Sequence, residues 1–269
     1  MVGLSGCLGG GSTNTTEWLV DPFHLPGEPE NYPLISFSPS AFDEYSSEFE
    51  RDEFNDFQDS SLREYEFTRF YADEIDRITR GNSGFRSNGF DIIQGDIDGE
   101  ALEEDLRREG LRSRSDYEGY ELFESARGDE HPFPWAAGVN DGTLLTAGSR
   151  NEDVDVLRLI ENLIDTQEGE LRGYQEVSSD FELLMDGSSI GDYFFAFNME
   201  PPESSDPESG DFRDMVGASQ NINIGEDESN VELVIAFQFD YEPRESDIET
   251  WTREDDLFRL WRDIDIDID

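Results

Sequence analysis

Lysine is absent from this chain of 269 residues, and all 19 basic residues are arginines. Without lysine the chain has no P-loop, no Schiff-base amine and no Ser-x-x-Lys nucleophile. Cysteine and histidine are scarce, with Cys7, His24 and His131 as the whole supply. These three residues cannot build a zinc site by themselves, although Asp and Glu could add ligands. No apolar run approaches 18 residues, so we expect no membrane-spanning helix.

Acidic residues dominate what is present, with 66 Asp and Glu and a formal net charge of −47. A folded chain of 30.7 kDa exposes roughly 12,000 Å², which places carboxylates on the order of 13 Å apart. At a Debye length of about 8 Å they still repel, whereas molar salt shortens it to roughly 3 Å. Such a surface disfavours nucleic acid as a partner. Together with the missing lysine, this composition resembles that of proteins from extreme halophiles, notably halophilic archaea.

High net charge is also typical of intrinsic disorder. Leu, Ile, Val and Phe nevertheless form about a quarter of the chain, above the ~20% typical of disordered proteins. The chain also has 20 Phe and 4 Trp, which is aromatic-rich for a solvated coil. We therefore expect a chain that folds in salt, as one or two domains.

The single cysteine lies near the start, in Leu4-Ser5-Gly6-Cys7. This stretch resembles a lipobox, the cleavage site of bacterial and archaeal lipoproteins. The resemblance implies that Cys7 carries a lipid and begins the mature chain, although a chance match at a frayed terminus is the alternative. Only six residues precede Cys7, so the charged and apolar regions of a signal peptide are missing. We expect that the start was assigned late or that the chain was trimmed.

The glycine-rich stretch Gly9–Thr13 reads as a flexible tether between a membrane and a folded domain. Asn14-Thr15-Thr16 fits an N-glycosylation acceptor on that tether. We accordingly assign residues 1–17 to a lipobox and tether, residues 18–172 to a first α+β module and residues 173–269 to a second.

Strand and helix signals alternate beyond the tether. We expect strands at residues 33–37, 74–80, 89–95, 117–123, 134–139, 143–148, 192–198, 218–224 and 231–241, and helices beginning near Ser40, Asp98, Glu152, Ser178 and Thr252. A helix–strand–strand–strand–helix order thus occurs twice, without residue-level identity between the copies. The pattern predicts an α+β fold with largely antiparallel sheets and helices packed on one face.

The chain ends on "DIDIDID", residues 263–269, whose strict alternation suits a half-buried strand. Its partner strand could be supplied by another chain. Alternatively its charges protect an edge against such pairing, which is the interpretation we favour.

Three short motifs invite a chemical interpretation. Gly187–Gly191 (GSSIG) matches the G-x-S-x-G nucleophile elbow, but a strand follows it and both histidines lie upstream, so we interpret it as a turn. Asp96, Asp98 and Asp105 fall on EF-hand positions, yet the loop lacks its first Asp, its last Glu and a preceding helix. We expect no metal or cofactor there, and Asp98 as a helix cap. The loop containing His131, Phe133 and Trp135 could form a contact surface, although packing is the simpler interpretation.

The sequence as a whole resembles haloarchaeal surface lipoproteins of unassigned activity. That resemblance implies a lipid-anchored protein on the extracellular face of the cell membrane, with a non-enzymatic binding or envelope-associated role. Its partner would be a small molecule or an envelope protein. The solute-binding lipoprotein of an uptake transporter, with two parallel α/β lobes, and a secreted hydrolase stay open as alternatives.

Overall fold

The computed structural model describes residues 15–44, 65, 71–82, 88–125, 133–206, 212–224, 230–238, 243–244, 246–248 and 250. Its strands are β1 (Leu34–Phe37), β2 (Ile75–Gly81), β3 (Gly89–Gly95), β4 (Leu111–Tyr117), β5 (Tyr120–Ser125), β6 (Trp135–Asn140), β7 (Thr143–Gly148), β8 (Tyr193–Asn198), β9 (Met215–Asn223) and β10 (Asn230–Phe237). Its helices are α1 (Pro39–Glu44), α3 (Gly99–Arg108), α4 (Val156–Gln167), α5 (Tyr174–Val177) and α6 (Ser179–Asp186), with short 3-10 helices η1 (Thr15–Trp18), η2 (Pro22–His24) and η4 (Ala72–Glu74).

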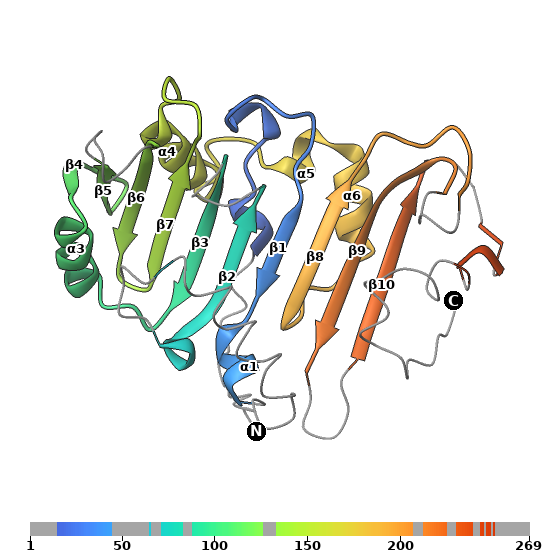
Figure 1. Ribbon diagram of the computed structural model, residues 1–269, viewed down its shortest axis with the longest axis horizontal. Coiled ribbons are helices and arrows are strands. Elements are labelled where there is room, and N and C mark those ends of the chain that lie inside the picture. Colours follow the sequence, from blue (N-terminus) through green and yellow to red (C-terminus); the bar gives the residue numbers. More distant parts are fainter. Residues whose placement is uncertain are drawn as a thin grey trace, which may run out of the picture.

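All ten strands form one antiparallel sheet in the order β10-β9-β8-β1-β2-β3-β7-β6-β5-β4 (Figure 1). The short strand β1 lies in the middle, where Phe37 pairs with Ile78 on one side and with Tyr193 on the other. Strands from both sides of the expected module boundary at residue 172 therefore belong to the same sheet, and β4 and β10 are its edges. The α+β class and the antiparallel pairing are confirmed.

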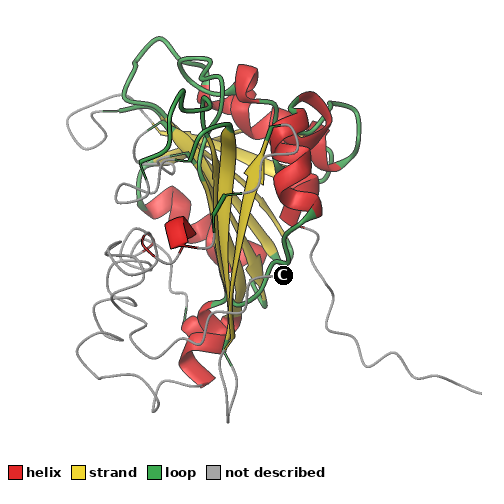
Figure 2. Cartoon of the chain, turned by 90° about the vertical axis from the view of Figure 1, so that its right-hand side faces the viewer, coloured by secondary structure: helices red, strands yellow, loops and turns green. Residues whose placement is uncertain are grey.

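Both faces of the sheet are covered, and in Figure 2 helices lie on both sides of the strands. A first core lies under α4, α5 and α6, where Phe90, Leu145 and Phe194 of the sheet are fully buried. A second core lies on the opposite face, where Leu102 and Leu106 of α3 pack with strand residues. Helices α4 to α6 thus share one face, as expected, while α3 and α1 lie on the other.

Strand β3 shows how the sequence specifies burial on both faces. Phe90 and Ile92 belong to the first core and Ile93 to the second, because successive strand residues point to opposite faces. Asp91 shares a face with Ile93 and is fully buried. Its Oδ1 accepts a hydrogen bond from Arg80 Nε of β2 at 2.7 Å, so the buried carboxylate has a cross-strand cationic partner.

Helix starts follow side-chain caps. Asp98 Oδ1 accepts from the Ala101 amide at 3.1 Å and begins α3, as predicted. The predicted helix near Glu152 begins later, because Asp155 is the residue that caps α4, accepting from the Arg158 amide at 3.1 Å. Gly110, with φ +87°, follows the end of α3. The sequence therefore predicted α3 and α6 at their caps, placed the starts of α1 and α4 at the wrong residues and did not predict the short helix α5.

The predicted start of the strand at residues 117–123 is wrong. Glu118 and Gly119 have positive φ values of 45° and 86° and form a turn, so the strand residues after it belong to β5. Before the turn lies β4, an additional strand that the sequence pattern did not indicate. The turn expected around Gly142 and the hairpin of β2 with β3 are confirmed.

The expected helix after Thr252 and the expected strand at 263–269 lie outside the described residues. None of the helices in the described ranges is long and apolar enough to cross a membrane.

Candidate functional site

The residues singled out from the sequence do not form a common site. Cys7, Asn14 and His131 lie outside the described residues. Phe133 is 44% exposed, whereas Trp135 begins β6 and packs against the second core. The structure thus separates Phe133, a surface side chain, from Trp135, a packing residue.

The three candidate metal ligands, Asp96, Asp98 and Asp105, have different structural roles. Asp98 is the cap of α3, and the buried Asp105 forms an ion pair with Arg108 one turn along the same helix. Asp96 is an exposed residue of the turn before α3. Across the parts of the chain that the structure describes, no group of three or more His, Cys, Asp or Glu is placed to hold a metal ion.

The GSSIG motif lies between α6 and β8, so a helix precedes it and a strand follows it. This is the reverse of the order that a nucleophile elbow requires. Ser189 Oγ donates to Glu232 Oε2 at 2.5 Å and accepts from Asn221 Nδ2 at 2.9 Å. Ser188 Oγ donates to the Leu184 carbonyl at 2.6 Å. In the described ranges neither serine has a histidine partner, and the interpretation as a turn agrees with this geometry.

Gly191 fixes this turn against the sheet. A Cβ at Gly191 would lie 2.2 Å from Asn223 Oδ1 and 2.6 Å from Asn221 Oδ1, so no larger residue fits without movement. Its carbonyl accepts from Arg77 Nη1 at 3.1 Å. Burial lowers the pKa of Arg77 from its usual value, while Asp192 acts in the opposite direction. The motif therefore has a structural role as the turn that connects α6 to β8.

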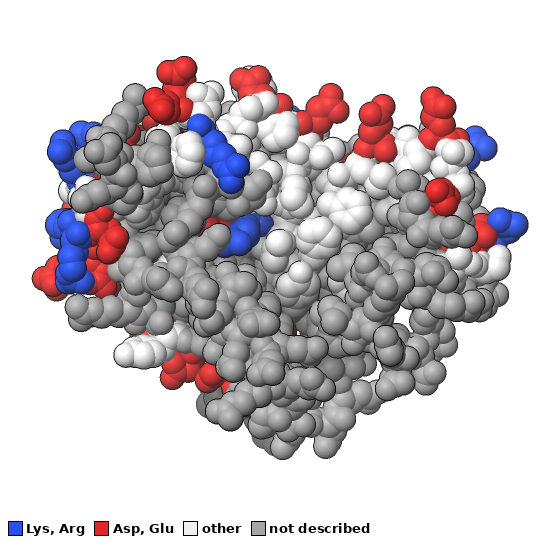
Figure 3. All heavy atoms as spheres, viewed as in Figure 1, with Lys and Arg blue, Asp and Glu red and all other residues white. Residues whose placement is uncertain are grey.

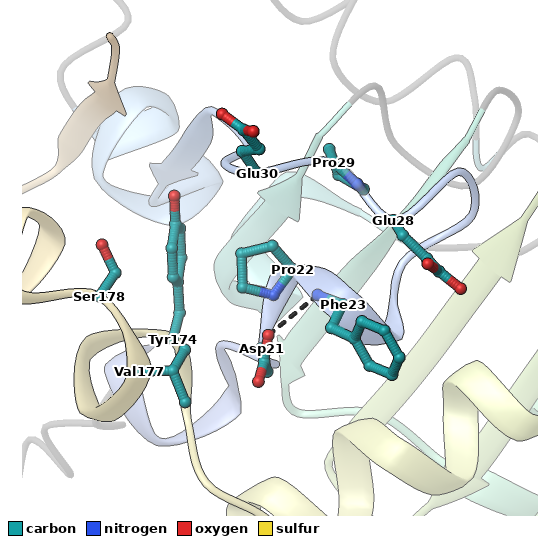
Figure 4. A pocket seen from close by; sticks show the side chains of 9 residues that line it. All are labelled: Asp21, Pro22, Phe23, Glu28, Pro29, Glu30, Tyr174, Val177 and Ser178. Carbon is teal, nitrogen blue, oxygen red and sulfur yellow. Dashed lines mark hydrogen bonds between the residues drawn. The ribbon is translucent and has the colours of Figure 1, made fainter. Parts of the chain in front are cut away.

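A surface pocket of about 390 Å³ lies among the described residues. Its lining residues come from two distant segments and are Asp21, Pro22, Phe23, Glu28, Pro29, Glu30, Tyr174, Val177 and Ser178. Figure 4 shows Tyr174, Val177 and Ser178 on one side, and Pro22, Phe23 and Glu28 on the other. The volume is within the range of small-molecule sites.

The segment 21–30 is a stiff, irregular loop. Asp21 Oδ1 accepts from the Phe23 amide at 2.9 Å and caps η2, where Pro22 fixes the backbone. The amide of Glu28 donates to the carbonyl of Leu25 at 3.0 Å, and Leu25 is buried and anchors the loop. Phe23 remains 63% exposed and presents an apolar ring at the pocket.

The other wall is held by a stack of three aromatic rings. Tyr174 lies between Tyr32, at 4.6 Å between ring centroids, and Phe181, at 4.0 Å. Its hydroxyl donates to Asn198 Oδ1 at 3.0 Å and accepts from the Tyr32 amide at 3.3 Å. Burial raises the pKa of Tyr174 to about 12. The Tyr174 amide also donates to the Leu19 carbonyl at 2.6 Å, which ties the two walls together.

The chemistry of the lining is acidic and apolar. Asp21, Glu28 and Glu30 supply three carboxylates, and none of the lining residues is basic. Ser178 Oγ is occupied as the cap of α6, accepting from the Phe181 amide at 3.3 Å. A ligand suited to this surface is an organic cation with an apolar body, because carboxylates attract the charge while Phe23 and the prolines contact the body.

Sequence reasoning missed this pocket. The prolines and Gly27 indicated an irregular loop, but nothing in the sequence linked that loop to Tyr174, which hydrogen-bonds a residue 142 positions away.

Comparison with known proteins identifies no family. No family model matches the chain, and no curated protein matches it. Among solved structures it is similar to three crystal forms of TP0453. Form III has 9% identity and a TM-score of 0.47, with 88% of this chain and 85% of that chain covered. Form IV has 11% identity and a TM-score of 0.42, covering 76% and 75%. Form I has 10% identity and a TM-score of 0.46, covering 91% and 86%. At these values the likeness supports no conclusion about function.

Proposed function

We propose that this chain is a lipid-anchored surface protein of a halophilic archaeon, and that its folded domain binds small organic cations in the pocket between residues 21–30 and Tyr174. The observation that carries the binding role is the pocket itself, whose lining includes three carboxylates and the exposed ring of Phe23. The observation that supports the anchor is the unique Cys7 in its lipobox-like setting, followed by the glycine-rich stretch.

A binding role fits the hydrogen bonding of the polar groups that line the pocket. Ser178 caps a helix, and the Tyr174 hydroxyl has both a donor and an acceptor partner. No nucleophile with a neighbouring general base faces the pocket among its lining residues. Recognition by charge and apolar contact is what this set of groups can provide.

The two alternatives receive less support. A solute-binding lipoprotein of the usual kind has two lobes of largely parallel structure, whereas the strands described here form one antiparallel sheet. A serine hydrolase needs histidine near its nucleophile, and His24, the histidine within the described residues, contacts the ring of Phe23 and hydrogen-bonds no serine.

Anchoring is tested by expressing the full-length gene product in a halophilic host, beside a Cys7→Ser variant. We expect the wild-type protein in the membrane fraction with a lipid-modified Cys7 as its first residue, and the variant outside that fraction. Both proteins in the cytoplasm with an unmodified thiol would overturn the anchor.

Ligand binding is tested by ¹⁹F NMR with 4-fluorobenzylammonium, using neutral 4-fluorobenzyl alcohol as the matched probe. We expect line broadening for the ammonium probe only, and its loss in a Glu28→Gln, Glu30→Gln double variant. Glu152→Gln changes an exposed carboxylate outside the pocket and serves as the control. Equal broadening by both probes, or an unaffected double variant, would overturn the cation site.

A further inference from the structure

We propose that the ligand of the pocket between residues 21–30 and Tyr174 is an aliphatic polyamine, a chain of methylene groups that carries a primary ammonium group at each end. The inference rests on the proposed function, because it names the chemical class of the cation that the same site binds. It distinguishes polyamines from cations with a single charge and from quaternary ammonium ions, which have no N–H donor.

The charge of the lining favours a ligand with more than one positive charge. Asp21, Glu28 and Glu30 supply three carboxylates, and none of the lining residues is basic. A monocation leaves two of these charges without compensation, whereas a diamine compensates two. The surroundings are acidic as well, since Figure 3 shows acidic side chains along the upper rim of the molecule, where Figure 1 places the blue loop that leads into β1. Coulomb attraction therefore rises with the charge of the ligand.

The three carboxylates occupy different places around the pocket. In Figure 4 the carboxylate of Glu30 lies at the top of the view, that of Glu28 at the right and that of Asp21 below Pro22. One ammonium group therefore cannot contact all three. Ammonium groups joined by methylene spacers can reach separate carboxylates, because the spacer carries the second charge away from the first contact.

The carboxylates have acceptor capacity left for a ligand. Within the described ranges Glu28 and Glu30 have no side-chain hydrogen bond and no ion pair. Asp21 accepts from the Phe23 amide through Oδ1 at 2.9 Å, which leaves Oδ2 for a ligand. A primary ammonium group has three N–H donors. It therefore adds charge-assisted hydrogen bonds to the attraction between the charges.

The aromatic residues of the pocket do not form a box around a quaternary ammonium ion. Both faces of Tyr174 are covered, by Tyr32 at 4.6 Å and by Phe181 at 4.0 Å between ring centroids. Among the lining residues Phe23 alone presents an exposed ring. Quaternary ammonium ions are recognised by cages of several aromatic faces. Hydrogen bonding to carboxylates is the remaining means of recognition, and it requires N–H donors on the ligand.

Apolar groups of the lining suit the methylene spacers. Pro22, Phe23, Pro29 and Val177 contribute aliphatic or aromatic surface beside the carboxylates, and burying a CH₂ group against such surface is favourable. The aliphatic chain of a polyamine thus replaces water at this surface while its ends remain with the carboxylates.

The loop that carries two of the carboxylates is held in one conformation. Gly27 and Glu28 have positive φ values of 88° and 47°, and the Glu28 amide donates to the Leu25 carbonyl at 3.0 Å. Pro29 then restricts the backbone between Glu28 and Glu30. Because the backbone positions of these two glutamates are set before a ligand binds, we expect diamines of increasing chain length to show one preferred length.

The experiment is isothermal titration calorimetry of the full chain with three probes that share one four-carbon chain. 1,4-Diaminobutane has two primary ammonium groups, 4-amino-1-butanol has one, and the hexamethylated derivative of the diamine keeps both charges without an N–H donor. The titrations use the lowest KCl concentration at which circular dichroism shows a folded protein, because salt screens the charges. We expect 1,4-diaminobutane to bind about fivefold more tightly than either other probe, the upper range for one exposed ion pair.

Variants of the loop test which carboxylates take part. Glu28→Gln and Glu30→Gln should each weaken the binding of 1,4-diaminobutane by about two- to fivefold. Glu118→Gln is the matched control and should leave this binding unchanged. Glu118 is also exposed and has a left-handed backbone, with φ 45°, but it lies in the turn between β4 and β5 and does not line the pocket.

The outcomes separate this inference from the proposed function. Equal affinity for the diamine and for 4-amino-1-butanol, or for the diamine and its hexamethylated derivative, would overturn the polyamine and leave the cation site intact. An equal effect of Glu118→Gln and of the pocket variants would also overturn it, because net charge alone would then attract the ligand. No binding of any probe would overturn the cation site together with the polyamine.

Discussion

Replacing Tyr174 with phenylalanine removes one hydroxyl from the aromatic stack and keeps the ring. The loss leaves Asn198 Oδ1 without its donor and the buried Tyr32 amide without its acceptor. Leaving one buried polar group unpaired costs about 1–3 kcal/mol. Because the Asn198 side chain lies nearer to solvent than the Tyr32 amide, we expect the free energy of unfolding at pH 8 to fall by about 2 kcal/mol.

The same substitution changes the response to alkaline pH. Burial raises the pKa of Tyr174 to about 12 in the folded protein, against about 10 when unfolded. Between these values the unfolded chain releases the proton and the folded chain keeps it. Tyr174 therefore contributes stability that is full below pH 10 and is lost as the pH rises toward 12. That loss reaches about 2.7 kcal/mol, and about 2 kcal/mol by pH 11.5.

The two effects predict a crossover. The phenylalanine variant should be less stable than wild type by about 2 kcal/mol at pH 8, and nearly equal to it at pH 11.5. Urea unfolding followed by tryptophan fluorescence, at constant salt, measures both differences. Tyr71→Phe changes an exposed tyrosine and should show neither effect. A stability difference that stays constant from pH 8 to 11.5 would refute the buried, titrating hydroxyl, and none at pH 8 would refute its hydrogen bonds.

Three further outcomes are expected. Gly191→Ala should lower the free energy of unfolding by about 2 kcal/mol in urea titrations, because its Cβ would lie 2.7 Å from the backbone carbonyl oxygen of Ile222, which cannot rotate away; unchanged stability would mean that the turn is not packed as described. Asp91→Asn should lower the free energy of unfolding by about 3 kcal/mol, because it breaks the buried ion pair with Arg80. This is the lower end for such a pair, since Arg80 retains some exposure. A loss under about 1 kcal/mol in the same titration would contradict the prediction. Lowering KCl from about 3 M to about 0.1 M should lower Tm by calorimetry, whereas a Tm independent of salt would count against the halophilic interpretation.

Local structure was predicted well wherever a helix cap, a terminal glycine or an apolar pattern marked an element in the sequence. The cap at Asp98 and the glycine after the helix predicted α3, and the apolar pattern of β3 predicted a strand. Strand β4 was missed because, of its seven residues, only Leu111 is buried and Tyr117 half-buried. Its strand conformation depends on pairing with β5, which single-sequence periodicity does not report.

The arrangement of the sheet and the pocket depends on partners far apart in the chain. Nothing in the four residues of β1 indicates that they lie between β2 and β8. The pocket likewise joins residues 21–30 to Tyr174, and its walls depend on stacking with Tyr32 and Phe181. Such contacts are decided by tertiary packing between distant segments, which the local sequence pattern does not report.

The central place of β1 has a consequence for how the protein folds. One side of β1 can pair with β2 early, whereas its other side must wait for β8, about 150 residues later in the chain. Closing a loop of that length before any pairing energy is gained slows folding. During synthesis β1 is therefore the open edge of a seven-stranded sheet until β8 exists, because β8, β9 and β10 all come later in the chain than the other strands. A nascent chain that ends before β8 thus exposes the unpaired side of β1, a strand edge open to wrong pairing.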